Sequence, residues 1–153
     1  MVSSLEDKKR LLDACLETVR ERVKQISASL EEAREASFSE TKSSAGDKYE
    51  TGREMMRMQS DMRALQLYEA QDLQDRLERI DVTQAHDKVR TGSVVRTTNG
   101  LFFVSQSMGQ VELDCMEYQT MSLAAPMGKA LKGLGVGDFA LFRDQKIEIL
   151  SIL

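Results

Sequence analysis

Acidic residues gather in one short polar stretch of this 153-residue chain, between two long segments with helical spacing. Asp47 and Glu50 are three residues apart, so they would share one face of a helix that begins after a Ser44 cap. Such carboxylates could carry negative charge to a target. They could equally be ordinary first-turn residues, because acidic groups are favoured at a helix N-terminus. The acidic residues in and around positions 37–50 are Glu35, Glu40, Asp47, Glu50 and Glu54.

The other reactive side chains form no catalytic or zinc-binding pattern. His86 is the only histidine, and we predict that it lies in a linker with no nucleophile and orienting group to pair with. Cys15 lies in a helical stretch and Cys115 in a predicted strand, and neither belongs to a CxxC pair. The N-terminal residues lack a long apolar run, so we expect neither a signal peptide nor a membrane span. We therefore expect a cytoplasmic protein with free thiols.

Composition argues against direct binding of nucleic acid. The net charge is -4, aromatic residues make up 5% of the chain, and tryptophan is absent. A basic patch and stacking aromatics are the usual requirements for binding DNA or RNA, and neither is visible here. We expect no strong DNA binding and no membrane association, although a protein partner could itself hold nucleic acid.

The first long segment carries the apolar spacing of a coiled coil. Its apolar residues follow one another at intervals of four and three, which predicts a helix from about Ser4 to Ala36. Ser4 and Asp7 form a candidate capping box at its start. Polar residues and Gly46 then predict a turn within Ser37–Gly46. The predicted apolar seam is Leu12, Leu16, Val19, Val23, Ile26, Leu30 and Ala33.

The second long segment continues this spacing, which predicts an antiparallel helical hairpin over residues 1–85. Met55, Met58, Met62 and Leu65 are expected to pack in its seam, because flexible methionine fills an uneven interface. A role for these methionines in binding a partner or a metal is the weaker alternative. The spacing resumes one residue out of phase at Ala70, Leu73, Leu77 and Ile80. One hairpin and two paired chains share this pattern, so it leaves the oligomeric state open.

Residues 91–153 change to the spacing of β-strands and predict a small α+β domain. Asn99-Gly100 between two apolar runs indicates a hairpin. We predict an antiparallel sheet, a short helix over Pro126–Leu131 and a closing hairpin. The domain carries few charges and is a candidate for docking on another protein. The expected strands are Ser93–Thr98, Leu101–Ser107, Val111–Asp114, Tyr118–Leu123, Phe139–Arg143 and Lys146–Ile152.

One stretch of this domain, APMGKALKGLGVGD, resembles the C-terminal domain of the bacterial Gre transcript cleavage factors. The residues that match the family pattern are Pro126, Gly128, Ala130, Leu131, Gly133, Val136, Gly137 and Asp138. The resemblance implies a fold like that of FK506-binding proteins for residues 91–153, after an N-terminal coiled-coil hairpin. It is specific at this motif and looser in the hairpin.

The resemblance also implies a partner and a mechanism. Gre factors bind RNA polymerase through the C-terminal domain and insert the hairpin into the secondary channel. Acidic residues there help to hold a second Mg²⁺, so that the polymerase cleaves its own backtracked RNA. Such a factor contacts the nascent RNA only indirectly and has no cofactor of its own beyond this shared Mg²⁺. The family's tip pattern, G-D-x-x-E, matches Gly46–Glu50, which makes Asp47 and Glu50 the expected site residues.

Several alternatives remain open at this point. A second register places Glu40 on the family's glutamate and Ser37 on its aspartate, and cleavage activity would then be lost. A close functional variant is a channel-binding regulator or inhibitor that does not stimulate cleavage. Two other classes are a peptidyl-prolyl isomerase, suggested by the implied fold alone, and a coiled-coil scaffold.

Overall fold

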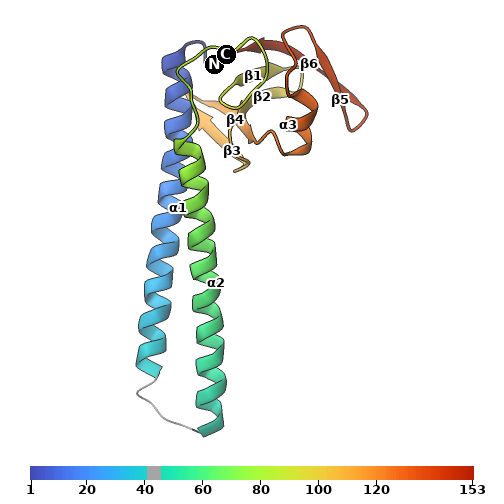
Figure 1. Cartoon of the computed structure of the whole chain (residues 1–153). Helices are drawn as coiled ribbons and strands as arrows, with labels where there is room; N and C mark the ends of the chain where they lie inside the picture. The colour runs from blue at the N-terminus through green and yellow to red at the C-terminus, as the bar shows by residue number, and fades with distance from the viewer. Residues whose placement is uncertain (41–45) are drawn as a thin grey trace. The chain divides into compact units, whose positions relative to one another are not determined.

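The computed structural model contains two long helices, a six-stranded sheet and one short helix (Figure 1). It describes the backbone of residues 1–40 and 46–153 and the side chains of residues 1–38 and 50–153. The predicted α+β class and the order of the elements are confirmed. Over the described residues, no helix combines the length and the apolar character that crossing a membrane requires.

The first helix, α1, spans Leu5–Glu40 and opens on the predicted capping box. The Asp7 amide donates to Ser4 Oγ over 3.1 Å, and the Ser4 amide donates to Asp7 Oδ2 over 3.2 Å. The helix continues to Glu40 instead of ending at Ala36, because α-helical bonding tolerates the polar residues that were expected to end it. The predicted seam is confirmed: Leu12, Leu16, Val19 and Leu30 are buried, and Val23, Ile26 and Ala33 are partly buried.

The second helix, α2, spans Gly46–Glu78, and its predicted seam is wrong over the first half. Met55, Met58, Met62 and Leu65 are all exposed. The residues of α2 that face inward are instead Met56 and Leu67, which are partly buried, and Ala70, which is buried. Arg63 Nε also donates to Ser29 Oγ of α1 over 2.8 Å. The heptad spacing identified an apolar stripe correctly, but α2 has two such stripes and the other one packs on α1. The later part of the prediction holds, because Leu77 and Ile80 are also buried.

The strands form one sheet in the order β3-β4-β2-β1-β6-β5. Thr97 pairs with Gly100, so the first hairpin turns at Thr98-Asn99, one residue earlier than expected. Cys115 lies in the turn between β3 and β4 and is not in a strand. The strand bounds are β1 Val94–Thr97, β2 Gly100–Val104, β3 Gln110–Leu113, β4 Met116–Met121, β5 Phe139–Phe142 and β6 Gln145–Ile152.

The sheet is mixed, which corrects the expectation of a purely antiparallel one. Phe102 to Val104 of β2 pair in parallel with Gln119 to Met121 of β4. The parallel pair arises because the chain passes β2, forms β3 at the sheet edge and returns as β4 between them. Local turn signals predict hairpins between sequential strands and do not reveal such a crossover.

The short helix α3, Pro126–Leu131, covers the apolar core of the sheet. Leu131 is fully buried and packs with residues of β1, β2 and β6, among them Val95, Val104 and Ile147. Proline in the opening turn fits the missing amide donor at that position. The prediction of this helix is confirmed with the same bounds.

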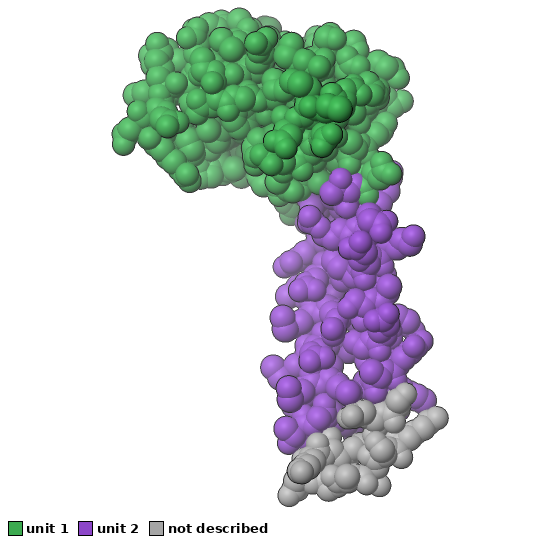
Figure 2. Space-filling view, turned by 180° about the vertical axis from the view of Figure 1, so that it is seen from behind, with its two compact units in different colours: residues 1–17, 76–153 green, residues 18–75 purple. Residues whose placement is uncertain are grey.

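The chain divides into two compact units (Figure 2). The first unit combines residues 1–17 with residues 76–153, and the second comprises Thr18–Asp75. Within the first unit, the Val2 amide donates to the buried Tyr118 hydroxyl over 2.8 Å. Arg10 also donates to both carboxylate oxygens of Asp114, over 2.7 and 3.0 Å. The start of α1 is therefore part of the unit that contains the sheet.

Candidate functional site at the start of α2

The predicted site residues lie on either side of the connection between α1 and α2. Glu40 is the last residue of α1, and Asp47 and Glu50 lie in the first two turns of α2. Glu50 is exposed. The side chains of Glu40 and Asp47 and all of Ser44 lie outside the described residues. The helical backbone places Asp47 in the first turn of α2, where the free amides of a helix start favour negative charge, and Glu50 three residues further on.

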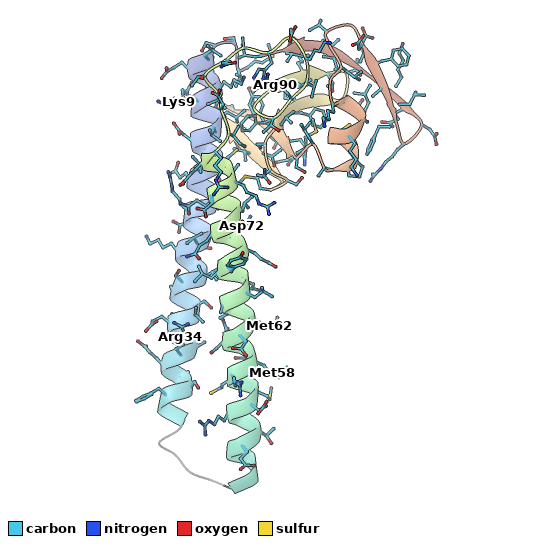
Figure 3. All side chains as sticks on the ribbon, in the orientation of Figure 1. Lys9, Arg34, Met58, Met62, Asp72 and Arg90 are labelled. Carbon is cyan, nitrogen blue, oxygen red and sulfur yellow. The ribbon has the colours of Figure 1, made fainter. Side chains whose placement is uncertain are left out.

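An open hollow of about 630 Å³ lies beside Glu50 in the second unit. Both helices line it, so the hollow is formed by the hairpin and not by one helix surface. Its most exposed apolar member is Phe38, near the end of α1. Figure 3 labels Arg34, which lines it from α1. The lining residues are Arg34, Ser37, Phe38, Glu50, Arg53, Glu54, Arg57 and Ser60.

The hollow contains charges of both signs with one more cation than anion. Arg34, Arg53 and Arg57 supply three guanidinium groups, and Glu50 and Glu54 supply two carboxylates. Among the residues that the structure describes, no ion pair within 4 Å joins any of these five side chains. The surroundings can therefore receive both a cation at the carboxylates and an anion at the guanidinium groups.

The three arginines were missed by the sequence reasoning. Arg53 and Arg57 are four residues apart and alternate with Glu50 and Glu54, which is also the pattern of a solvated helix face. Arg34 joins them only because α1 pairs with α2. The available signal was a charged face on each helix, and only the pairing of the helices brings those faces together.

The described carboxylates alone do not make a metal site. Within the part of the chain that the structure describes, no three His, Cys, Asp or Glu side chains lie close enough to share an ion. Mg²⁺ commonly takes one or two protein carboxylates and keeps several waters. Of the two predicted metal ligands, Asp47 and Glu50, only Glu50 has a described side chain.

A second polar cluster lies in the first unit, around the segment that follows α2. Lys8 is fully buried and donates to the Gln84 carbonyl over 2.7 Å. His86 Nδ1 lies 2.8 Å from Ser93 Oγ, which also accepts from the Arg90 amide over 3.1 Å. Because Ser93 is fully buried, its hydroxyl is closed to a substrate. The cluster fixes the segment in place and offers no accessible nucleophile.

Burial changes the protonation of this cluster. It lowers the pKa of Lys8 to about 8, against an opposing attraction from Asp81. It also lowers the pKa of His86, and the neighbouring Lys8 cation acts in the same direction. His86 is therefore mostly neutral near pH 7 and can bond to Ser93 in either tautomer.

The glycines of the Gre-like motif are explained by packing and backbone conformation. A Cβ on Gly128 would lie 2.0 Å from the Ser122 carbonyl oxygen. Gly133 and Gly137 have φ of 78° and 87°, where side chains are strained. Asp138 Oδ2 accepts from the Gly135 amide over 2.7 Å. These residues specify the fold around α3 and do not themselves form a reactive site.

Aromatic residues of the sheet are mostly in the core. Phe102, Phe103 and Tyr118 are buried, and the Tyr118 hydroxyl is occupied by the Val2 amide. Those three rings therefore do not line an open pocket for a proline side chain. This placement gives the peptidyl-prolyl isomerase alternative no support.

The chain is similar to a solved structure of another protein. A solved structure of the transcription factor Gfh1 is 21% identical, with 91% of this chain and 93% of that chain covered and a TM-score of 0.40. No family model and no curated protein matches the chain. At this TM-score, nothing about the function of the chain follows from the likeness.

Proposed function

We propose that this chain is a Gre-like transcription elongation factor. It binds RNA polymerase through residues 91–153, places the end of its helical pair in the secondary channel and stimulates cleavage of backtracked RNA. The chain acts as an accessory factor, and the polymerase active site performs the cleavage. The proposal starts from the motif at Pro126–Asp138.

The observation that carries the proposal is the position of Gly46–Glu50. This segment forms the opening of α2, immediately after the connection from α1, and Glu50 is exposed there. The acidic residues therefore occur where the hairpin reverses, as a channel-inserting factor requires. A hairpin end can reach a confined site that a sheet domain cannot enter, since each helical residue adds ~1.5 Å of length.

Three charged residues of the hollow, together with Asp47, have a role in the proposal. Asp47 and Glu50 would hold a Mg²⁺ shared with the polymerase, and that ion would activate water and stabilise developing charge when bound. Arg53 and Arg57, which line the hollow with Glu50, would bind a phosphate of the RNA, because guanidinium groups match phosphate oxygens in geometry and charge.

The decisive experiment measures RNA cleavage in stalled, backtracked complexes of the source organism's RNA polymerase. The wild-type chain is compared with Asp47→Ala/Glu50→Ala. We expect wild type to stimulate cleavage. The double variant should reduce this stimulation at least about 100-fold, because removing a group that stabilises developing charge typically has an effect of this size. Binding of the variant to polymerase should be retained.

The matched control is Asp13→Ala/Glu17→Ala, which removes two exposed carboxylates from α1 within the first unit. This control variant should stimulate RNA cleavage as strongly as wild type does. Equal activity of wild type and Asp47→Ala/Glu50→Ala would transfer the role to Glu40 and the second register. Binding that inhibits without cleavage would make the chain a channel regulator, and failure to bind polymerase would refute the proposal.

A further inference from the structure

The exposed side of α2 carries a continuous apolar stripe in the second unit. The outer stripe, defined as Met55, Met58, Met62, Leu65 and the adjoining Tyr68, lies at intervals of three and four residues. These side chains are 58%, 62%, 62%, 59% and 68% exposed. Figure 3 labels Met58 and Met62 on α2. Large contiguous apolar patches are uncommon on soluble proteins unless another molecule covers them.

The outer stripe is not the face that packs on α1. At ~100° per residue it is centred well over 90° from Met56, Leu67 and Ala70, which turn inward. A helix with apolar residues on two faces is suited to lie between two neighbours, and α1 covers only one of those faces. The spacing of the outer stripe is that of a helix-packing seam, so the missing neighbour is a helix.

The charges beside the outer stripe select the chemistry of that helix. Glu54 and Asp61, seven residues apart, border the stripe on one side, and Glu69, seven residues after Met62, lies in line with the stripe beyond Leu65. All three carboxylates are exposed, and none of them has an ion pair among the described residues. Uncharged Gln59 and Gln66 border the other side. Arg57, three residues after Glu54 and four before Asp61, lies beside two of these carboxylates and lines the hollow with Glu54. The three carboxylates outnumber this guanidinium, so the border has a net negative charge.

This acidic border disfavours a second copy of the chain. An antiparallel pair of α2 helices joined at the outer stripe would place Glu54 and Asp61 against the same carboxylates of the other copy, and like charges repel across such a seam. Anionic lipid and nucleic acid are disfavoured for the same reason. A helix with Lys or Arg beside its own apolar face would neutralise the border and cover the stripe.

We propose that the outer stripe docks an amphipathic, basic helix of another protein. Flexible, polarizable methionine suits this task, because it adapts to partners of different shape and loses little when exposed between encounters. The outer stripe lies further along α2 than Asp47 and Glu50 and shares only its bordering residue Glu54 with the hollow, so the proposal does not rest on the proposed role in RNA cleavage.

The test uses a synthetic helical peptide as the probe. A fluorescein-labelled peptide of about 18 residues, built from Leu and Lys with Leu on one helical face, is titrated with the full chain and followed by fluorescence anisotropy. A matched peptide with Glu in place of Lys is titrated in parallel. We expect the Lys peptide to bind at least about tenfold more tightly than the Glu peptide, with weaker binding at higher salt.

Two variants separate docking from general adhesion of an apolar peptide. Met58→Gln/Met62→Gln removes apolar surface while keeping good helix formers, and Asp61→Lys/Glu69→Lys reverses the acidic border. Each should weaken binding of the Lys peptide about tenfold. Glu112→Lys/Glu117→Lys makes the same charge change on exposed positions of the sheet and should bind as wild type does. Far-UV circular dichroism verifies that helix content is unchanged in each variant.

Three outcomes would overturn the proposal. The first is equal affinity for the Lys and Glu peptides. The second is undiminished binding by Met58→Gln/Met62→Gln. The third is a concentration-dependent dimer in sedimentation experiments that the same double variant abolishes, since a second copy would then be the occupant.

Discussion

At the scale of single residues, Lys8 is the least expected side chain in the structure. It is fully buried, and its ammonium group donates a hydrogen bond to the Gln84 carbonyl. Burying an ammonium group disfavours its charged form, which is why the pKa of Lys8 falls to about 8 although Asp81 opposes the change. A buried cation reduces the stability of the fold at every pH at which it remains protonated.

The sign of the pH dependence follows from this lowered pKa. Between pH 8 and 10.5 the unfolded chain still binds a proton at Lys8 and the folded chain does not, so this group makes stability rise with pH. The resulting increase in the free energy of unfolding is on the order of 3 kcal/mol at most, and it is absent below pH 8. Urea unfolding of wild type and Lys8→Met at pH 7.5 to 10.5 measures it as the difference between the two chains.

The exposed neighbour provides the control for this measurement. Lys9→Met removes the same charge from the same turn of α1, and its unfolding free energy should follow that of wild type across the pH range. If the difference in unfolding free energy between wild type and Lys8→Met stays constant from pH 7.5 to 10.5, the lowered pKa of Lys8 is contradicted.

At the scale of elements, the local signals predicted α3 and most strand bounds to within a few residues. Turns are set by short-range chemistry, as at Arg143-Asp144, where both residues have positive φ and close the last hairpin. The parallel pairing of β2 with β4 was missed because it joins segments separated by β3. The packing face of α2 was missed because two apolar stripes compete and only the partner helix selects one.

The candidate site was predictable to a different extent. The order of the acidic residues along the chain predicted their position at the start of α2, and the helical backbone there agrees. Arg34 was not predictable, since its contribution to the hollow depends on how two helices pair. The roles of Asp47 and Glu50 stay a prediction, because they concern a second molecule.

The element-scale prediction concerns Gly128 in α3. Gly128→Ala would place a Cβ 2.0 Å from the Ser122 carbonyl oxygen, and backbone atoms cannot yield as a flexible side chain can. We expect destabilisation of about 2 kcal/mol or more, the cost of overpacking a core. Thermal or urea unfolding of the variant measures it.

Gly133→Ala separates packing from backbone strain. Gly133 has a positive φ but open space around its Cβ position, so alanine there should cost only about 1 kcal/mol. Equal losses of unfolding free energy in Gly128→Ala and Gly133→Ala would show that the close approach at Gly128 is not the dominant effect.

At the scale of the whole molecule, the unit that contains the sheet is larger than residues 91–153. It includes residues 1–17 and the segment from Arg76 onward, joined by the bonds from Val2 to Tyr118 and from Arg10 to Asp114. The division into a hairpin over residues 1–85 and a domain over residues 91–153 stays a prediction. The contacts favour the larger unit as the one that retains full stability.

Two fragments test this directly. Residues 91–153 alone should unfold at a lower urea concentration than a chain in which Thr18–Asp75 is replaced by a short Gly-Ser linker, because the first fragment exposes the surface that α1 covers. Equal urea midpoints, with equal dependence on urea, would instead support residues 91–153 as an autonomous domain.

The two thiols of the chain have opposite environments, and this has a practical consequence. Cys15 is buried, and burial raises the pKa of its thiol to about 12, so it stays protonated and shielded. Cys115 is exposed in the turn between β3 and β4. A maleimide dye will therefore attach to the native chain at one defined position, which gives a fluorescent reporter of complex formation without any engineered cysteine.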